Sequence, residues 1–372
     1  MKGLYIHIPF CVKKCLYCDF YSLPARLDAR QSYVNAVLRE AEAYSGLSFQ
    51  TLYLGGGTPS LLGAELLSDL LRGLNRSLDL QDMVEATVEV NPESATGEFL
   101  EAARDAGINR VSIGIQSLVD SELKAVGRIH TAAQALQALK LAVRLGFKSI
   151  SADLIIGLPG QTWPTLSQSL ETLVSSGIEH LSLYCLSLEE GTPLAKCPPA
   201  DLPSDNMQAE LFEQASSFLE EHHYIHYEIS NFALKGYECR HNLNYWQGGE
   251  YLGLGPAAAS HLGGRRFRNR ADLKAYLEEP TDQMEDSEEL NAKDKAAEEA
   301  MLRLRLLVEG IDISELTARF GPDNIATLIS RFQHMASHGR LVTDGCRYWL
   351  PPSRVLTSNP IFAEVLDAGA PE

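Results

Sequence analysis

The first half of the sequence alternates short apolar runs with longer segments of helical periodicity, and this rhythm restricts the fold more than any other feature. Several of the helical segments end at a glycine, as at Gly107, Gly146 and Gly177. Six strand-then-helix units at a spacing of roughly 30–45 residues require a parallel sheet with right-handed crossovers. The predicted strands cover residues 4–8, 49–54, 84–90, 110–115, 149–156 and 179–186, and the helices between them cover residues 29–44, 63–74, 99–106, 132–145 and 165–176.

The number of units limits how such a sheet can close. Six units are fewer than the eight of a complete TIM barrel, so we predict an α/β fold with a partial (β/α)6 TIM-like barrel. A flat, doubly wound sheet remains the alternative, because periodicity alone does not decide whether a sheet curls.

Beyond residue 186 the rhythm changes, and a Pro-containing stretch leads into a different arrangement. The segment 240–262 is rich in glycine and aromatic residues and is predicted to form loops across an open face, and the acidic segment 278–294 is the predicted linker. The other predicted elements are helices at 205–221, 296–308 and 325–337, a strand at 224–229, and a hairpin of 341–343 with 347–350.

These elements predict three parts. Residues 1–186 form the barrel core, residues 187–280 an extension of the barrel, and residues 281–372 a small helical domain with a hairpin, of winged-helix-like type. A chain of 372 residues is long enough for a barrel-sized domain and a smaller one.

Composition excludes several classes of protein. A formal net charge of −17 argues against nucleic-acid binding, which needs a basic surface. No apolar stretch approaches the roughly 18 residues of a transmembrane helix, and the N-terminus does not resemble a signal peptide. Seven cysteines, an odd number, fit a reducing compartment better than a disulfide framework. We therefore expect a cytoplasmic protein.

Three of those cysteines, Cys11, Cys15 and Cys18, lie within eight residues directly after the first predicted strand. Thiolates three and four positions apart in one loop can converge on a metal centre. A zinc site would need a fourth ligand, and the sequence has no second cysteine pair to supply it. Three thiolates suit a [4Fe–4S] cluster that leaves one iron open to a small molecule.

This spacing, Cys-x3-Cys-x2-Cys at the head of six βα units, resembles the radical S-adenosylmethionine (SAM) superfamily. The preceding text, Tyr5-Ile6-His7-Ile8-Pro9-Phe10, is similar to the branch that contains the oxygen-independent coproporphyrinogen III oxidases and the HemW-type heme chaperones. The resemblance extends over nearly the whole chain. It implies that SAM chelates the open iron and that reductive cleavage can yield a 5′-deoxyadenosyl radical.

The resemblance also implies which residues contact SAM. Independently of it, a glycine-rich turn permits close backbone approach to a ligand, and the carboxyl ends of barrel strands are where active sites form. The implied SAM contacts are Tyr5, Tyr17, Gly56, Gly57, Thr58, Glu89, Gln116, Arg128 and Asp153. On residues alone, the glycines also fit a tight strand-to-helix turn. A carboxylate inside the strand 149–156 would be buried and would need a partner.

A second motif, His241-Asn-Leu-Asn-Tyr245-Trp246, resembles the HNxxYW motif of the HemW-type proteins. A histidine can ligate heme iron, and tyrosine and tryptophan offer flat apolar surface to a porphyrin. The alternative is a loop histidine whose aromatic neighbours pack the open side of the barrel. His7, between apolar strand residues, is expected to be a core or supporting histidine.

A short basic patch, Arg265, Arg266, Arg268 and Arg270, stands out in this acidic chain. It is either ordinary solvated surface or a contact for heme propionates or acidic lipid headgroups, since arginine suits carboxylates. Peripheral contact with the inner membrane is therefore left open.

The resemblance leaves three hypotheses about function. In the first, the chain is a heme chaperone that carries a [4Fe–4S] cluster, SAM and heme, and delivers heme to respiratory-chain apoproteins with the help of an electron donor. In the second, it is an oxidase that decarboxylates coproporphyrinogen III. Phe20 replaces the oxidase's further cysteine, no leader precedes Tyr5, and the HNxxYW motif is present, so the chaperone is favoured. The third, a cluster-bearing scaffold without SAM, conflicts with the complete set of implied SAM contacts. Whether the chain is an enzyme stays undecided, and no catalytic residue is assigned.

Overall fold

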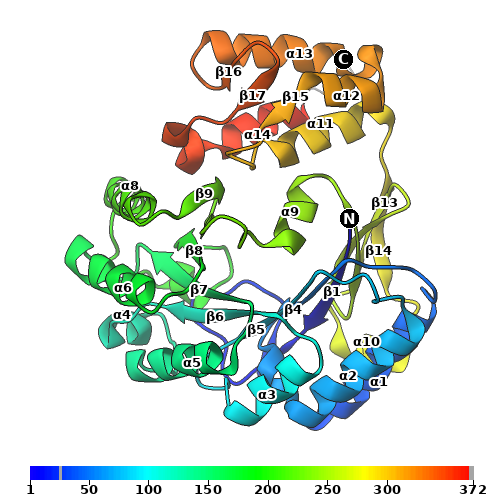
Figure 1. Ribbon diagram of the computed structural model, residues 1–372, viewed down its shortest axis with the longest axis vertical. Helices are drawn as coiled ribbons and strands as arrows, with labels where there is room; N and C mark the ends of the chain where they lie inside the picture. The colour runs from blue at the N-terminus through cyan, green and yellow to red at the C-terminus, as the bar shows by residue number, and fades with distance from the viewer. Residues whose placement is uncertain (25–26, 368–372) are drawn as a thin grey trace.

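The computed structural model describes residues 1–24 and 27–367, and its largest feature is a twelve-stranded sheet. Six parallel strands lie side by side in this sheet, and helices surround their outer side (Figure 1). These strands are β1 (Lys2–Ile8), β4 (Thr51–Gly56), β5 (Glu85–Val90), β6 (Arg110–Gln116), β7 (Ser149–Ile156) and β8 (His180–Cys185). All six correspond to strands predicted from the apolar runs.

The strand order decides between the two predicted topologies. The six strands lie in the spatial order β1-β4-β5-β6-β7-β8, which is also their order along the chain. The chain therefore crosses the sheet in one direction. A doubly wound sheet reverses direction at a switch point. Right-handed crossovers without a reversal place every connecting helix on one face. The prediction of a partial (β/α)6 barrel is therefore confirmed, and the sheet remains open within the described residues.

The connecting helices follow from capping and from amphipathic spacing. In α5, the Thr131 hydroxyl accepts a hydrogen bond from the Gln134 amide, the Gln134 side chain returns to Thr131, and Gly146 ends the helix with a φ of 74°. The helices of the barrel are α1 (Arg30–Glu42), α2 (Ala64–Ser77), α3 (Gly97–Asp105), α4 (Asp120–Ala125), α5 (Ala132–Leu145) and α6 (Trp163–Ser175), with a 3₁₀ turn at Pro59–Leu62.

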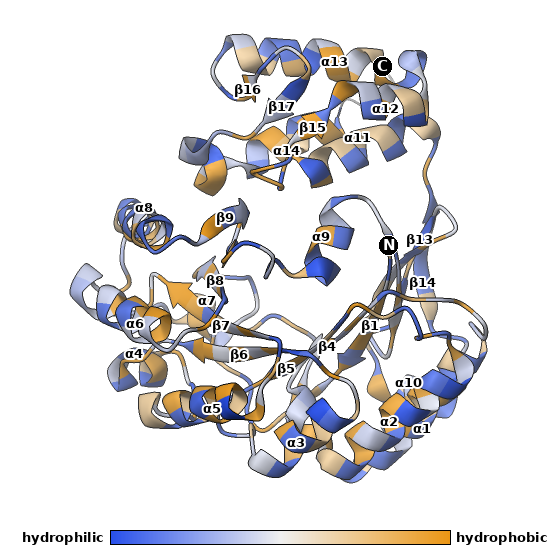
Figure 2. Cartoon of the chain, in the orientation of Figure 1, coloured by the Kyte–Doolittle hydropathy of each residue, from blue (hydrophilic) through white to orange (hydrophobic). Residues whose placement is uncertain are grey.

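Strand β1 shows how the sheet divides its two faces. Leu4, Ile6 and Ile8 are fully buried in the hydrophobic core, whereas Tyr5 and His7 point to the opposite face and line a cavity. Figure 2 shows that the helices around the sheet are mixed in character, with hydrophobic and hydrophilic residues along each of them. The core therefore lies between sheet and helices, and polar residues collect on the inner face.

Beyond β1 the sheet continues through residues predicted as loops and linker, and both predictions are wrong. The segment 240–262 folds into a helix and two strands, and the acidic segment 278–294 contains an edge strand. Glycine and acidic residues suggested irregular structure, but β11 pairs in parallel with β1, and acidic β14 pairs with arginine-rich β13. The elements are α9 (Arg240–Trp246), β11 (Glu250–Leu254), β12 (Ala259–Leu262), β13 (Arg265–Asn269), α10 (Leu273–Glu278) and β14 (Met284–Glu289).

At the other edge, two antiparallel strands extend the sheet past β8. The helix predicted at 205–221 is confirmed as α8, which packs against α6. The elements of this edge are α7 (Pro193–Lys196), α8 (Asp205–Glu221), β9 (Ile225–Glu228) and β10 (Asn231–Ala233). Two short strands, β2 (Phe10–Cys11) and β3 (Leu23–Pro24), bracket the cysteine loop.

The C-terminal region consists of helices and a three-stranded sheet in the order β15-β17-β16, compatible with the predicted winged-helix-like domain. It lies beside α9, which α11 contacts (Figure 1). Its elements are α11 (Ala292–Arg303), β15 (Ile311–Asp312), α12 (Ile313–Phe320), α13 (Pro322–Ser337), β16 (Val342–Thr343), β17 (Arg347–Trp349), a 3₁₀ turn (Pro352–Thr357) and α14 (Asn359–Leu366). The helix predicted at 296–308 starts earlier and ends at Arg303. The division into three parts stays a prediction, and β14, beyond residue 280, belongs to the large sheet.

None of the helices in the described part of the chain is long and apolar enough to cross a membrane.

Candidate functional site

The carboxyl ends of the parallel strands open into a cavity of about 460 Å³. Most of the residues predicted to bind the cluster or SAM meet there, although they come from separate strands and loops. Those that line the cavity are Cys11, Cys15, Tyr17, Cys18, Gly56, Gly57, Glu89, Gln116, Arg128 and Asp153. Thr58 and Tyr5 do not line it.

The cysteine loop follows directly from β1 and β2 and is fixed by backbone hydrogen bonds. The amide of Leu16 donates to the Val126 carbonyl at 3.1 Å, and the amide of Cys18 donates to the Cys15 carbonyl at 3.3 Å. All three loop thiols are free and partly exposed. The loop therefore presents three unpaired thiols to the cavity.

The other two cysteines act electrostatically on the Cys18 thiol. Burial raises the pKa of the Cys18 thiol, and the neighbouring Cys15 and Cys11 raise it further, whereas Lys14 lowers it. A positively charged iron–sulfur centre would relieve this repulsion by binding all three as thiolates. Within residues 1–24 and 27–367, no three metal-binding side chains converge tightly enough for a single ion.

A chain of hydrogen bonds connects two of these sulfurs. The Thr58 hydroxyl donates to Cys11 Sγ at 3.6 Å and accepts from the side-chain Nδ2 of Asn91 at 2.9 Å. Arg128 donates to Asn91 Oδ1 at 2.7 Å and to Cys15 Sγ at 3.6 Å. Arg128 thus places a positive charge beside the sulfurs. Sequence reasoning missed Asn91, because Asn-Pro after a strand was interpreted only as the end of that strand.

The two predicted carboxylates lie on β5 and β7, with β6 between them. Tyr53 donates to Glu89 Oε1 at 2.7 Å, and burial raises the pKa of Glu89 to about 7, with the charge of Asp153 contributing. Ser112 donates to Asp153 at 3.1 Å, and burial raises the pKa of Asp153 as well. Asp153 therefore has the partner that a carboxylate inside a strand requires.

The glycine turn has a structural reason for its composition. Gly56 has a φ of 105°, and a Cβ there would lie 2.7 Å from the His7 ring. A Cβ on Gly57 would lie 2.6 Å from the Phe10 carbonyl oxygen. The amides of Gly57 and Thr58 donate to the carbonyls of Ile8 and Phe10 at 2.8 and 2.7 Å. These two amides are thus used within the protein, and the close packing against β1 accounts for the glycines.

Gln116, the last residue of β6, has an unusual backbone conformation with a φ of 66°. Non-glycine residues seldom adopt positive φ, and such strain occurs preferentially at functional sites. The conformation holds this residue at the wall of the cavity.

A second cavity, of about 440 Å³, adjoins the first, and Phe20 lines both. Its walls are largely aromatic. It contains two residues of the HNxxYW motif, Tyr245 and Trp246, together with Tyr5, Tyr21 and Tyr251. Tyr5, which the resemblance implied as a SAM contact, therefore faces the aromatic cavity.

The third residue of the motif, His241, does not reach this cavity. It has no exposed surface, and its two ring nitrogens are 2.8 Å from Thr51 Oγ1 and from the Tyr245 hydroxyl. Burial lowers its pKa to about 3. Glu85 of β5 accepts hydrogen bonds from the backbone amides of Arg240 and His241, each at 3.0 Å, and so fixes the first turn of α9. Here His241 supports Tyr245 instead of facing a ligand.

The basic patch is matched by acidic residues of the neighbouring strand. Arg268 pairs with Asp286 at 2.5 Å and Glu285 at 3.6 Å, and Arg270 pairs with Glu285 at 3.8 Å. Arg266 pairs with Glu298 of α11. These pairs largely neutralise the patch and weaken its interpretation as a lipid contact.

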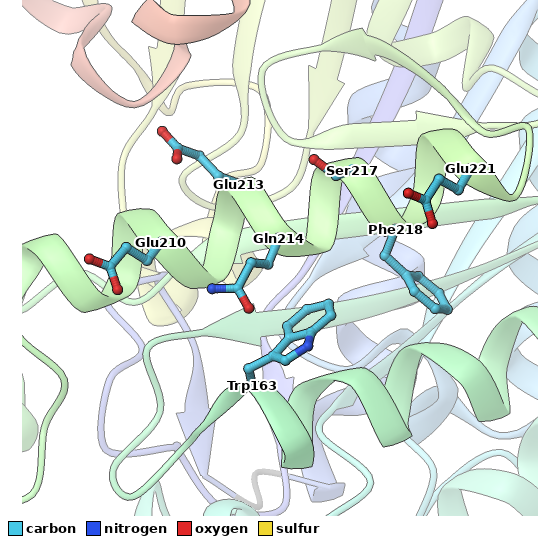
Figure 3. Close-up of a pocket in the computed structure, with 7 residues that line it drawn as sticks. All are labelled: Trp163, Glu210, Glu213, Gln214, Ser217, Phe218 and Glu221. Carbon is cyan, nitrogen blue, oxygen red and sulfur yellow. The ribbon is translucent and has the colours of Figure 1, made fainter.

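Figure 3 shows a separate groove on the outer side of the barrel, where Trp163 at the start of α6 faces α8. The rings of Trp163 and Phe218 meet edge to face at a centroid distance of 6.5 Å, and Glu210, Glu213 and Glu221 surround them. The groove contains none of the predicted site residues.

Comparison with known proteins agrees with this geometry. Residues 5–173 match the model of the Radical SAM superfamily. The chain is 36% identical to the heme chaperone HemW of Lactococcus lactis over 308 residues, covering 82% of this chain and 81% of the relative. It is 34% identical to HemW of Bacillus subtilis, covering 98% and 99%.

A solved structure supports the fold. The coproporphyrinogen III oxidase HemN of Escherichia coli, described as a radical SAM enzyme, superposes with a TM-score of 0.84 at 23% identity, over 99% of this chain and 89% of that one. At this identity the likeness concerns the fold alone. Together with the two HemW relatives, these matches show that the chain belongs to the family of HemW heme chaperones within the radical SAM superfamily.

Proposed function

We propose that this protein binds a [4Fe–4S] cluster, SAM and heme, and delivers heme to respiratory-chain apoproteins. The observation that carries the proposal is the pair of adjoining cavities. One presents three thiols and the residues implied for SAM, the other presents aromatic walls, and Phe20 lines both. With a cluster bound, a redox-active centre would lie next to a site suited to a flat apolar cargo.

Within the first cavity, Cys11, Cys15 and Cys18 would hold the cluster. When bound, the cluster supplies an iron with an open coordination position and a source of single electrons. Thr58 and Arg128 donate hydrogen bonds to the sulfurs of Cys11 and Cys15, which tunes the potential of a cluster.

The remaining residues of that cavity would bind SAM. Glu89 and Asp153 offer carboxylates to its cationic groups, while Gln116 offers an amide and Tyr17 an aromatic face. Their positions at the carboxyl ends of parallel strands are those from which barrel proteins bind their ligands. Thr58 does not line the cavity, and its role is the hydrogen bond that it donates to the sulfur of Cys11.

In the second cavity, Tyr245 and Trp246 would contact the heme, and His241 would position Tyr245 through the hydrogen bond between its ring and the phenol. Aromatic side chains provide the flat apolar area that a porphyrin face requires. The proposal also holds that the protein delivers heme to apoproteins, receives electrons from a donor and lies in the cytoplasm. The location is inferred from the odd number of cysteines.

The oxidase remains the second candidate, since the E. coli oxidase HemN has the same fold. An oxidase would bind coproporphyrinogen III and convert two propionates to vinyl groups. Phe20, in the place of the oxidase's further cysteine, and the names of the curated relatives favour the chaperone.

One experiment separates the two functions. The cluster-reconstituted protein is incubated anaerobically with SAM, a reductant and coproporphyrinogen III, and a parallel sample is titrated with heme and followed by absorbance. A chaperone takes up heme stoichiometrically and forms no protoporphyrinogen. Enzymatic formation of protoporphyrinogen would refute the chaperone, and a protein without the three cysteines provides the control for cluster dependence.

A further inference from the structure

Two histidines, His7 and His261, line the aromatic cavity, and neither belongs to the HNxxYW motif. His261, on β12, lines both this cavity and a smaller one of about 150 Å³ beneath α11. Its Nδ1 lies 3.4 Å from the Gly249 carbonyl, and its Nε2 has no hydrogen-bond partner among the described residues. An imidazole with one nitrogen held by a carbonyl and the other free is the usual arrangement of a metal ligand.

The two other histidines near the cavity lack a free nitrogen. His7 bonds with the Tyr5 hydroxyl at 3.0 Å and the Tyr21 carbonyl at 2.8 Å. His241 is fully buried, and both of its nitrogens are engaged. Ligation of a metal by either ring would require breaking a buried hydrogen bond, whereas ligation by His261 requires no such break.

The protonation state of His261 also suits a ligand. Burial lowers its pKa, the nearby charges of Arg266 and Lys295 lower it further, and the Gly249 carbonyl and Glu250 act in the opposite direction. The ring is therefore neutral at pH 7, and its free nitrogen carries a lone pair.

The smaller cavity places cations next to this histidine. Arg266, Lys295 and Arg319 line it, and Arg266 borders the aromatic cavity as well. Arg266 pairs with Glu298, and Arg319 with Glu299. In the described part of the chain, Lys295 has no carboxylate within ion-pair distance. Lys295 is thus the cation free to meet an acidic group of a ligand that enters from the aromatic side.

We propose that His261 is the axial ligand of the heme cargo and that Lys295 receives a heme propionate, an inference that rests on the proposed function. The porphyrin then lies in the aromatic cavity, in contact with Tyr245, Trp246 and Tyr251. The HNxxYW motif contributes an aromatic wall, and the iron ligand comes from the adjacent strand β12.

The test is a titration of the full-length protein with ferric heme, followed by the Soret absorbance and by electron paramagnetic resonance. Removing a group that only hydrogen-bonds to a metal ligand lowers metal affinity by about 10–100-fold, so loss of the ligand itself in His261→Ala should weaken heme binding at least roughly tenfold and remove the histidine-ligated spectrum. Added imidazole should restore that spectrum. Lys295→Gln should weaken binding and leave the spectrum unchanged. His222→Ala, at an exposed histidine after α8, is the matched control.

Each result is decisive. A His261→Ala protein with wild-type affinity and spectrum would overturn the inference while leaving heme binding, and with it the proposed function, intact. A wild-type protein that takes up no heme would overturn both. A His241→Ala protein that retains its melting temperature but loses the histidine-ligated spectrum would show that the iron ligand is His241 of the motif, and would refute the assignment of His261. Restoration of the His261→Ala spectrum by imidazole excludes misfolding as the cause of its loss.

Discussion

Glu89→Gln should change how the stability of the protein depends on pH. The folded protein holds the pKa of Glu89 at about 7, compared with 4.5 for an unperturbed carboxyl, chiefly because the group is buried. The unfolded chain ionises Glu89 from about pH 4.5 upward, whereas the folded chain keeps the proton until about pH 7. The contribution of Glu89 to stability therefore falls between these values and is constant above them.

The size of the effect follows from the two pKa values. One pKa unit corresponds to about 1.4 kcal/mol, so the ionised Glu89 costs about 3 kcal/mol above pH 7 and less than about 1 kcal/mol near pH 5. Glutamine retains the acceptor for the Tyr53 hydroxyl and carries no charge. Glu89→Gln should therefore gain about 2 kcal/mol relative to the wild type as pH rises from 5 to 8.

Urea unfolding at pH 5, 6, 7 and 8, with samples of equal iron content, measures this difference. Glu40 and Glu228 also have a pKa raised to about 7 by burial, so both proteins will lose stability with pH, and only the difference between them reports on Glu89. Glu65→Gln, at an exposed position of α2, is the control and should give no pH-dependent difference. Parallel stability curves for the wild type and Glu89→Gln would refute the reasoning.

Three further changes test other contacts. Gly56→Ala should cost at least about 2 kcal/mol of unfolding free energy, because the new Cβ meets the His7 ring at positive φ, whereas Gly146→Ala, in the left-handed region with open space around it, should cost about 1 kcal/mol. Glu85→Ala should cost about 3–5 kcal/mol, since it removes the acceptor at the start of α9. Arg128→Met should lower the reduction potential of the cluster in a redox titration, because it removes a cationic donor from Cys15.

Denaturation followed by circular dichroism measures the first two effects. Equal losses for the alanine variants of Gly56 and Gly146 would contradict the role of the His7 contact. Glu85→Gln retains one acceptor and should lose less stability than Glu85→Ala, and the reverse order would contradict the capping role. For the cluster, Arg128→Lys should lie between wild type and Arg128→Met.

The barrel was predictable because its signals are local. Strand β7 and helix α5 have the bounds that the sequence indicated, since a buried parallel strand is a continuous apolar run and α5 carries a capping box and a glycine end. Strands β11 and β14 were missed because their stability comes from partners far along the chain. Neither β11, which contains glycine, nor β14, which is acidic, has the local residue pattern that is typical of a strand.

The sequence predicted most of the residues that form the site, but only part of their arrangement. The cysteine spacing and the strand-end carboxylates identified the first cavity, because the topology brings strand ends together. The sequence could not show that His241 is enclosed by Thr51 and Tyr245, or that His261 is exposed to the aromatic cavity. Burial of a single ring depends on contacts between distant segments, which a motif does not record.

The pairing of β1 on both sides has a consequence for biosynthesis. Strand β1 pairs with β4 from Gly3 onward and with β11 from Lys2 onward, and the partner of Lys2 on β11 is Glu250. At about 5–20 residues per second, a ribosome needs roughly 12–50 s to reach that partner. During this time the first strand has an unpaired edge that can template incorrect pairing. Strand β1 is thus made long before its second partner, so premature termination before residue 250 yields a chain with an open, aggregation-prone sheet.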